Sequence, residues 1–180
     1  MKRSLKHLGF AKHLGEFQFK SWLNKNASGF LAEVGVIKGQ SVLDFGCGSG
    51  IYTIPAAKLV GESGRVYALD VSRKALDKVE EKAKQKGLRN IVQIDASGEE
   101  DIPLEDETLD LMLVIDVLQE IDNKEALFDE AHRTLKIGGV IAVYPMHMAT
   151  EEVEELAISR GFDLEDRKFQ GRILIFRKAP

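Results

Sequence analysis

The sequence predicts an α/β protein with a doubly wound, mostly parallel sheet of seven strands that ends in a C-terminal antiparallel hairpin. Three observations predict this class. From Gln40 onward, short apolar runs alternate with segments of helical periodicity. A glycine-rich turn follows the first apolar run, and aspartates recur where later runs end. We expect residues 1–180 to form one domain, with a core at residues 40–180 and a helical lid segment at residues 1–30.

The first half of the core is predicted to alternate strand and helix. Apolar runs predict strands at Ser41–Phe45, Arg65–Leu69 and Ile91–Ile94. The segment Ile51–Val60 is expected to be helical, with Pro55 near its start. Ser72 is the expected N-cap of the next helix, which ends at Gly87. Its inward positions follow helical spacing and are Ala75, Leu76, Val79 and Ala83.

The second half continues the same alternation and then changes to a hairpin. The unbroken apolar run Leu109–Ile115 indicates a strand buried on both faces. Asp122 and Glu125 have the spacing of a capping box, which predicts a helix to about Leu135. Gly138 and Gly139 are expected to turn the chain into a fifth strand. The remaining predicted elements are the strand Val140–Val143, a helix from its cap Thr150 to Gly161, and the hairpin strands Asp163–Phe169 and Arg172–Arg177.

The composition limits the classes of function. The hydrophobic fraction is 44% and the charged fraction 30%, as in an ordinary globular protein. A net charge of −4 gives no general attraction to nucleic acid or to an anionic membrane, so neither is expected as a partner. The lone Cys47 excludes an intrachain disulfide, and no metal site is predicted. With no export signal or spanning apolar run, we expect a cytoplasmic protein, and an oligomer is left open.

Residues 1–30 differ from the core because they are basic and contain several glycines and aromatic residues. One or two helices are predicted, including an amphipathic piece around Phe17–Leu23. The aromatic residues of this segment either pack in the core, which we favour, or line a hydrophobic substrate pocket. They are Phe17, Phe19, Trp22 and Phe30. His7 and His13 are expected at the surface, and His132 on the solvated face of its helix.

The segment Val42–Gly50, which reads V-L-D-F-G-C-G-S-G, is a strand that runs into a glycine-rich turn and then a helix. Glycines allow a ligand to approach the backbone closely, and such a turn usually binds a nucleotide-like ligand. The dinucleotide motif G-x-G-x-x-G fits poorly because its third glycine is replaced by Ile51, and no Lys-Ser/Thr follows to make a P-loop. The carboxylate of Asp44 would repel a pyrophosphate but would attract a cationic ligand.

This motif resembles that of the class I SAM-dependent methyltransferases, closest to the UbiE-like small-molecule group. The resemblance covers about Gln40–Gly139, where Leu135–Gly139 is similar to the family's L-K-P-G-G turn, with Ile137 in place of proline. It implies a Rossmann-like methyltransferase fold. It also implies methyl transfer from S-adenosylmethionine (SAM) to a small-molecule acceptor, with S-adenosylhomocysteine (SAH) as the product.

The resemblance also implies which residues hold the cofactor. The loop facing the methionine part maps to Asp44, Phe45, Gly46, Cys47, Gly48 and Gly50. The ribose maps to Asp70 with Val71, and the adenine to Asp95 with Ala96. Asp116 takes the position that borders both the sulfonium and the substrate.

The spacing of four aspartates supports this interpretation independently. Asp44, Asp70, Asp95 and Asp116 lie 26, 25 and 21 residues apart, each at or just after the end of a predicted strand. Consecutive strand–helix units place such residues on one rim, beside the crevice where doubly wound sheets bind ligands. Each aspartate alone is equally well explained as a helix cap or turn former. Four in register with the glycine turn favour a binding site.

Asp116, Tyr144 and His147 are the candidate catalytic residues, because each lies at or after the end of a predicted strand at the same rim. For His147 the plainer interpretation is a partly exposed loop histidine. Cys47 is better explained by loop packing than by a nucleophilic role. Two other functions stay open: a SAM-binding protein without catalysis, and an NAD-dependent oxidoreductase, which the missing third glycine and Asp44 disfavour.

Overall fold

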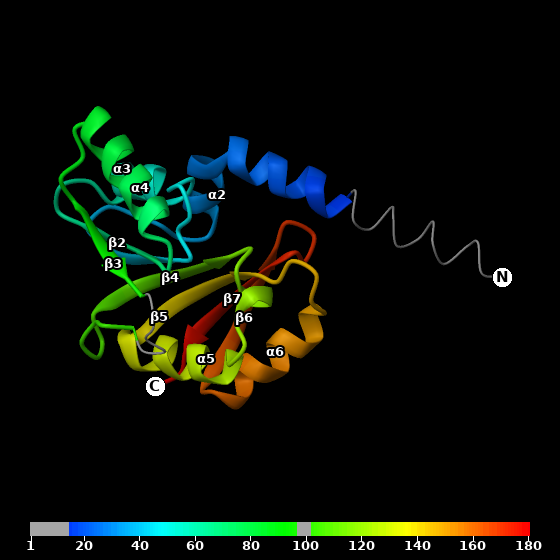
Figure 1. Cartoon of the computed structure of the whole chain (residues 1–180). Coiled ribbons are helices and arrows are strands. Elements are labelled where there is room, and N and C mark those ends of the chain that lie inside the picture. The colour runs from blue at the N-terminus through cyan, green and yellow to red at the C-terminus, as the bar shows by residue number, and fades with distance from the viewer. Residues whose placement is uncertain (1–14, 97–101) are drawn as a thin grey trace.

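The computed structural model describes residues 15–96 and 102–180, and it contains a seven-stranded sheet covered by helices on both faces (Figure 1). The strands are β1 (Ser41–Phe45), β2 (Arg65–Asp70), β3 (Ile91–Asp95), β4 (Leu109–Ile115), β5 (Leu135–Tyr144), β6 (Phe162–Lys168) and β7 (Ile173–Lys178). The helices are α2 (Ala27–Glu33), α3 (Thr53–Val60), α4 (Arg73–Gln85), the 3-10 helix η1 (Leu118–Glu120), α5 (Lys124–Thr134) and α6 (Thr150–Ser159). Residues 15–25 are also helical and precede α2.

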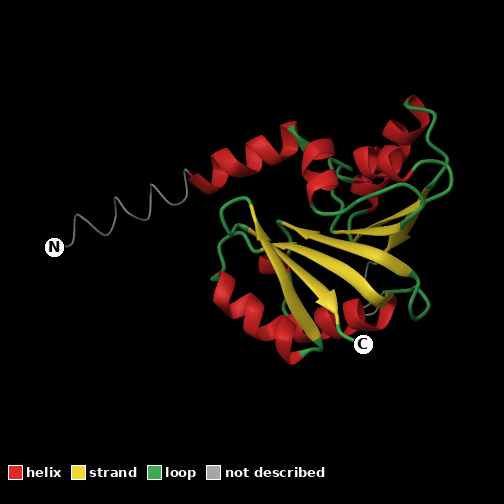
Figure 2. Cartoon of the chain, turned by 180° about the vertical axis from the view of Figure 1, so that it is seen from behind, coloured by secondary structure: helices red, strands yellow, loops and turns green. Residues whose placement is uncertain are grey.

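The strand order is β3-β2-β1-β4-β5-β7-β6. Strands β1 to β5 pair in parallel, and β7 pairs antiparallel with both β5 and β6, as the twisted sheet in Figure 2 shows. The chain runs outward from β1 to β3 and then returns to β4, so the topological switch lies between β1 and β4. The predicted fold class and its C-terminal hairpin are therefore confirmed.

Strand β4 forms the centre of the core. Met112 and Val114 pack with residues of α5 and α6 on one face, whereas Leu111 and Leu113 pack with residues of α2 and α3 on the other. All four side chains are buried, which confirms the strand predicted from the unbroken apolar run. Its end at Ile115 places Asp116 at the carboxyl edge of the sheet, next to the switch point. Among the described residues no helix is both long enough and apolar enough to cross a membrane.

Two helix caps differ from those predicted. Asn123, not Asp122, caps α5, because its side-chain oxygen accepts from the amide of Ala126 at 3.1 Å. Thr150 is the first helical residue of α6, and the cap position belongs to Ala149, whose side chain has no oxygen to accept a hydrogen bond. By contrast, the predicted cap Ser72 is confirmed, since its hydroxyl accepts from the amide of Ala75.

Strand β5 begins at Leu135, five residues earlier than predicted. The glycines thought to precede it lie inside it, where the pairing with β4 shifts register between Leu109 and Leu111. Gly138 has φ 74°, and a Cβ on Gly139 would lie 2.8 Å from the carbonyl oxygen of Lys136. The glycine pair thus forms an irregularity within a strand rather than the turn before one.

Helix α3 begins at Thr53, two residues later than predicted, because residues 48–52 form turns. The prediction that His132 lies on a solvated face is wrong. Its ring packs edge-on against Phe162 of β6 at 5.5 Å between ring centroids, and the residue is half-buried. His7 and His13 lie outside the described residues.

The helix at residues 15–25 packs against the turn that joins β6 to β7. Phe169 in that turn adopts φ 53°, and its ring lies 6.1 Å from that of Phe19 and 5.6 Å from that of Trp22. The guanidinium of Arg172 lies over the Phe19 ring and donates to the carbonyl oxygen of Gly15. Core packing is confirmed for Phe30, which is 1% exposed, but it is wrong for Phe17, which is 67% exposed.

Candidate cofactor and acceptor site

The glycine loop after β1 has a backbone that requires glycine. Gly46, Gly48 and Gly50 have φ of 71°, 50° and 78°. These are left-handed conformations that other residues adopt at a cost. A Cβ on Gly46 would lie only 2.6 Å from Val117 Cγ2. The loop therefore packs directly against the segment that follows β4.

Asp70, the last residue of β2, connects the glycine loop to the next helix. Its Oδ2 accepts from the amide of Gly48 at 2.8 Å, and its Oδ1 accepts from the amide of Ser72 at 2.8 Å. Each carboxylate oxygen keeps a second lone pair, so both can accept a further hydrogen bond. The side chain is thus held in place by backbone donors while it retains acceptor capacity.

A cavity of about 550 Å³ lies beside this loop, bounded by the ends of β1, β2 and β4 and by the start of α5. Seven of the residues predicted to hold a cofactor line it: Phe45, Gly46, Gly48, Asp70, Val71, Ala96 and Asp116. The volume falls within the usual range for small-molecule sites. The remaining lining residues come mainly from η1, from α5 and from the segment between them, where the sequence signalled only a helix cap. They are Leu69, Ile102, Val117, Glu120, Ile121, Asp122, Asn123, Ala126 and Leu127.

Four predicted cofactor residues do not line this cavity. Cys47 is buried, and Gly50 is packed so that a Cβ would lie 3.0 Å from Val79 Cγ2. Asp95 is exposed and pairs in register with Asp70. Burial and the nearby carboxylates of Asp44 and Asp70 raise the pKa of the Cys47 thiol far above its usual range, which favours its packing role over a nucleophilic one.

Asp44 is the fourth predicted cofactor residue that does not line the cavity. Its side chain is buried in the core, and the residue is 2% exposed. Its Oδ2 accepts from the Thr53 hydroxyl at 2.5 Å. Burial raises the pKa of this carboxyl from 3.8 to about 6, although the hydrogen bonds from Thr53 oppose the shift. The predicted cofactor residue Asp44 therefore lies in the core beneath the glycine loop and does not line the cavity.

We expect Asp44→Asn to change how stability depends on pH. Because the pKa of Asp44 is raised on folding, the folded state binds this proton more tightly than the unfolded state. Its contribution to stability is complete below about pH 4 and is lost as pH rises through about 6, a change of about 3 kcal/mol. The free energy of unfolding of Asp44→Asn, relative to wild type, should therefore rise between pH 4 and 7. Urea denaturation across this range tests the expectation, and parallel pH profiles would contradict it.

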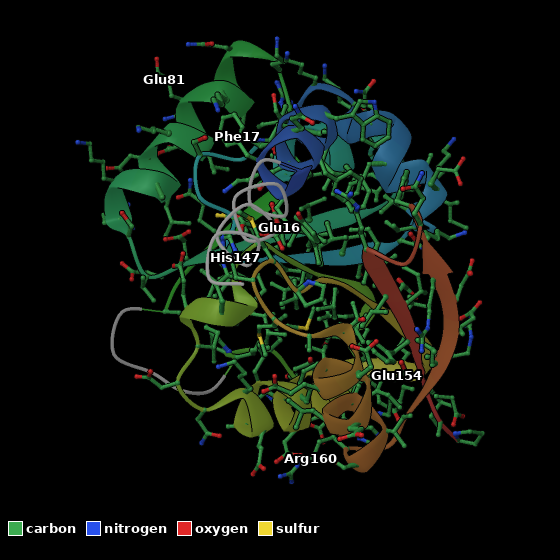
Figure 3. All side chains as sticks on the ribbon, turned by 90° about the vertical axis from the view of Figure 1, so that its right-hand side faces the viewer. Glu16, Phe17, Glu81, His147, Glu154 and Arg160 are labelled. Atoms are coloured by element: carbon green, nitrogen blue, oxygen red, sulfur yellow. The ribbon has the colours of Figure 1, made fainter. Side chains whose placement is uncertain are left out.

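The candidate catalytic residues all contact the helix at residues 15–25. The ammonium of Lys20 pairs with the Asp116 carboxylate. Glu16 Oε2 lies 3.0 Å from His147 Nδ1. Figure 3 shows Glu16 and His147 side by side. One turn beyond Lys20, Asn24 accepts a hydrogen bond from the Tyr52 hydroxyl at 2.9 Å. Glu16, Lys20 and Asn24 have i, i+4, i+8 spacing, which places them on one helix face.

Backbone geometry directs two of these groups toward the helix. Asp116 and His147 adopt φ of 59° and 67°, which is uncommon outside glycine and is often found at functional positions. Gln119 Nε2 donates to both the carbonyl and the carboxylate of Asp116, which holds that side chain in place. Sequence reasoning missed Lys20, Glu16 and Gln119. For the first two, the only signal was their helical spacing in the basic N-terminal segment.

Tyr144 lies under the same helix, at the end of β5. It is 4% exposed, and its ring meets that of Phe19 edge-on at 5.4 Å between ring centroids. Burial, together with the negative charges of Glu16 and Asp116, raises the pKa of the Tyr144 hydroxyl to about 12, while Arg172 opposes the shift. The hydroxyl therefore stays protonated near neutral pH and can act as a hydrogen-bond donor.

The topology, the glycine loop and the acidic end of β2 together define a Rossmann-like site for a nucleoside-containing ligand, with a second polar site beside it at Asp116. The family model described as "Methyltransferase domain" matches residues 37–164. The chain therefore belongs to this methyltransferase domain family, and the predicted class of SAM-dependent methyltransferases is confirmed.

Curated relatives carry related names. The chain is 28% identical over 135 residues to a demethylmenaquinone methyltransferase of Lactobacillus johnsonii, which covers 75% of this chain and 55% of the relative. It is 34% identical over 109 residues to the ubiquinone/menaquinone biosynthesis C-methyltransferase UbiE of Klebsiella pneumoniae. This match covers 61% of this chain and 43% of the relative. The chain thus spans about half the length of the curated relatives it matches.

Solved structures agree on the fold. A SAM-dependent methyltransferase from Aquifex aeolicus superposes with a TM-score of 0.74 at 26% identity, covering 87% of this chain and 90% of that one. The [4+2]-cyclase SpnF superposes with a TM-score of 0.71 at 18% identity, covering 84% of this chain and 80% of the cyclase chain. The second likeness concerns the fold alone, and a cyclase on this fold shows that the fold does not by itself determine the reaction.

Proposed function

We propose that this chain transfers a methyl group from SAM to a small-molecule acceptor. The observation that carries the proposal is the 550 Å³ cavity at the carboxyl edge of the sheet, which joins the glycine loop and Asp70 to Asp116. The names of the relatives support a small acceptor, since they describe methyltransferases of quinone biosynthesis. A lid formed by the helix at residues 15–25 is part of the proposal.

The residues present fit a SAM molecule. Gly46 and Gly48 expose backbone to the cavity, and the second lone pairs of Asp70 suit the two ribose hydroxyls. Ile102, Ile121 and Leu127 provide apolar walls of the kind that enclose a flat base. Asp116 lines the cavity at the end nearest the acceptor-side residues, where a cationic group would be stabilised by its carboxylate. Bound SAM would supply a methyl carbon made electrophilic by the attached sulfonium.

The remaining chemistry falls to residues at the acceptor side. Asp116, Tyr144 and His147 are proposed to border the accepting atom, the first two as orienting groups and the imidazole of His147 as a proton acceptor. The rings of Phe19 and Tyr144 would exclude water from the reacting atoms. In such a site positioning and desolvation contribute much of the rate.

SAM and SAH are each expected to raise the melting temperature of the purified chain, because a ligand specific to the native state stabilises it by mass action. The measurement is a thermal-shift titration of protein confirmed by mass spectrometry to be free of ligand, with NADH as the control nucleotide. A shift with NADH alone, or no shift at millimolar SAM, would contradict the cofactor assignment. Formation of SAH from methyl-labelled SAM with a metabolite extract then separates an enzyme from a protein that only binds SAM.

A further inference from the structure

The charged side chains that line the cavity beside the glycine loop are all carboxylates. They are Asp70, Asp116, Glu120 and Asp122, and no lysine, arginine or histidine is among the described lining residues. A concave site lined by charges of one sign focuses its field on whatever binds there, and this field favours a cation. The affinity of the cavity for a ligand should therefore depend on the charge that the ligand carries.

Asp116 is the lining carboxylate that has a lysine as its partner. Its Oδ2 pairs with the ammonium of Lys20, and its Oδ1 accepts from Gln119 Nε2 at 3.2 Å. Lys20 is not among the residues that line the cavity. The Asp116 side chain is only 15% exposed, so solvent ions screen this pair less than they screen a surface pair. Lys20 thus offsets part of the negative charge of the cavity from outside it.

The fold holds the Lys20 ammonium near Asp116 whether or not a ligand is bound. The helix at residues 15–25 is anchored just beyond Lys20, because Leu23 is fully buried and Asn24 accepts a hydrogen bond from Tyr52 at 2.9 Å. These contacts lie on the side of the helix that faces the sheet, as Lys20 does. The ion pair is therefore expected to persist when the cavity is filled.

The two forms of the proposed cofactor differ in the property that this pair affects. SAM carries a positive charge on its sulfonium, whereas the sulfur of SAH is uncharged. A carboxylate in contact with an ammonium acts on a third charge as a dipole, which attracts a cation less than a full negative charge does. An uncharged sulfur responds much more weakly to the same change.

We propose that Lys20, acting through Asp116, lowers the preference of the cavity for SAM over SAH. This inference rests on the methyl transfer proposed above and adds a residue that controls it. With the ammonium in place, SAH competes more effectively for the cavity, so methyl transfer slows sooner as the product accumulates. Lys20 is a positioning residue in this scheme, because it touches Asp116 and not the cofactor.

The test measures the dissociation constants of SAM and SAH by isothermal titration calorimetry at low salt, and it compares their ratio between variants. A change in folding or in the fit of the helix alters both constants alike and cancels in the ratio. Lys20→Met keeps the aliphatic stem and should shift the ratio in favour of SAM by about fivefold or more. Lys20→Arg keeps the charge and should retain the wild-type ratio.

A double-variant cycle shows whether Lys20 acts through Asp116. Asp116→Asn removes the carboxylate and should shift the ratio in favour of SAH. In this background Lys20→Met should no longer shift the ratio in favour of SAM, because the negative charge that Lys20 offsets is absent. Lys25→Met removes an exposed charge from another face of the same helix and should keep the wild-type ratio.

The inference is overturned if Lys20→Met changes both constants by the same factor, or if Lys25→Met shifts the ratio as far as Lys20→Met does. It is also overturned if Lys20→Met shifts the ratio equally with and without the Asp116 carboxylate. Lys20→Gln repeats the measurement should Lys20→Met fail to fold, and the same shift toward SAM is expected. Failure of the wild-type chain to bind either SAM or SAH is a separate result, and it would overturn the proposed function itself.

Discussion

Asp70→Ala is expected to weaken binding of both SAM and SAH at least tenfold. The substitution removes the acceptors proposed for the ribose hydroxyls, and charge-assisted hydrogen bonds of this kind contribute about 1.5–3 kcal/mol each. It also frees the amides of Gly48 and Ser72, which the carboxylate now holds at 2.8 Å, so the glycine loop keeps only the backbone bonds from Gly46 and Cys47 to Leu69 of β2. Isothermal titration calorimetry with SAH measures the effect directly.

Two further variants make the result specific. Asp70→Asn keeps one side-chain acceptor and should lie between wild type and Asp70→Ala. Asp77→Ala removes an exposed carboxylate on α4, where it pairs with Arg73, and should leave SAH affinity unchanged. An unaltered dissociation constant for Asp70→Ala would mean that Asp70 is only a turn residue.

Gly46→Ala is expected to destabilise the protein by about 2–4 kcal/mol, the sum of a left-handed backbone cost and an overpacking cost. The methyl group would lie 2.6 Å from Val117 Cγ2, at a position where φ is 71°. The clash moves either the glycine loop or the segment after β4, and both line the cavity, so SAM affinity should fall as well. Urea denaturation measures the first effect and calorimetry the second.

The steric part of this effect can be isolated. In the double variant Gly46→Ala with Val117→Ala, the 2.6 Å contact with Cγ2 is removed and the 3.0 Å contact with Cβ remains, so most of the clash is relieved and the two substitutions should be non-additive. Gly48→Ala serves as a comparison, because φ is 50° there but no atom lies within 4 Å of the added Cβ. Equal losses of stability in Gly46→Ala and Gly48→Ala would show that contact with Val117 plays no part.

The position of the cavity at the carboxyl edge of the sheet was predictable from sequence because it depends on backbone placement. Parallel strands end at one edge of a sheet, so a motif that fixes β1 also places the ends of β2 and β4. Side-chain direction was harder to predict. Asp44 lies within the motif, yet it turns into the core to meet Thr53, since neighbouring strand residues face opposite sides of the sheet.

The contacts that the helix at residues 15–25 makes with Asp116 and His147 could not be predicted, because they form by tertiary docking. Lys20 meets Asp116 across 96 positions of sequence, and neither residue has a neighbour that signals the pairing. The early start of β5 has a similar cause, since pairing with β4 extends the strand through two glycines that a local pattern assigns to a turn. The predicted positions of two helix caps were wrong by one residue. Asp122 and Asn123 are neighbours and equally good cap residues, and only the backbone geometry selects Asn123.

The contact between the helix at residues 15–25 and the β6–β7 turn has a consequence for the order of folding on the ribosome. Gly15 and Phe19 are among the first described residues to be synthesised, but their partners Arg172 and Phe169 emerge about 150 residues later. Contacts of such long sequence separation form late, because a large loop must close before they stabilise the chain. The glycine loop has its contact at Val117 once the segment after β4 has been made, whereas the helix at residues 15–25 waits for the final hairpin.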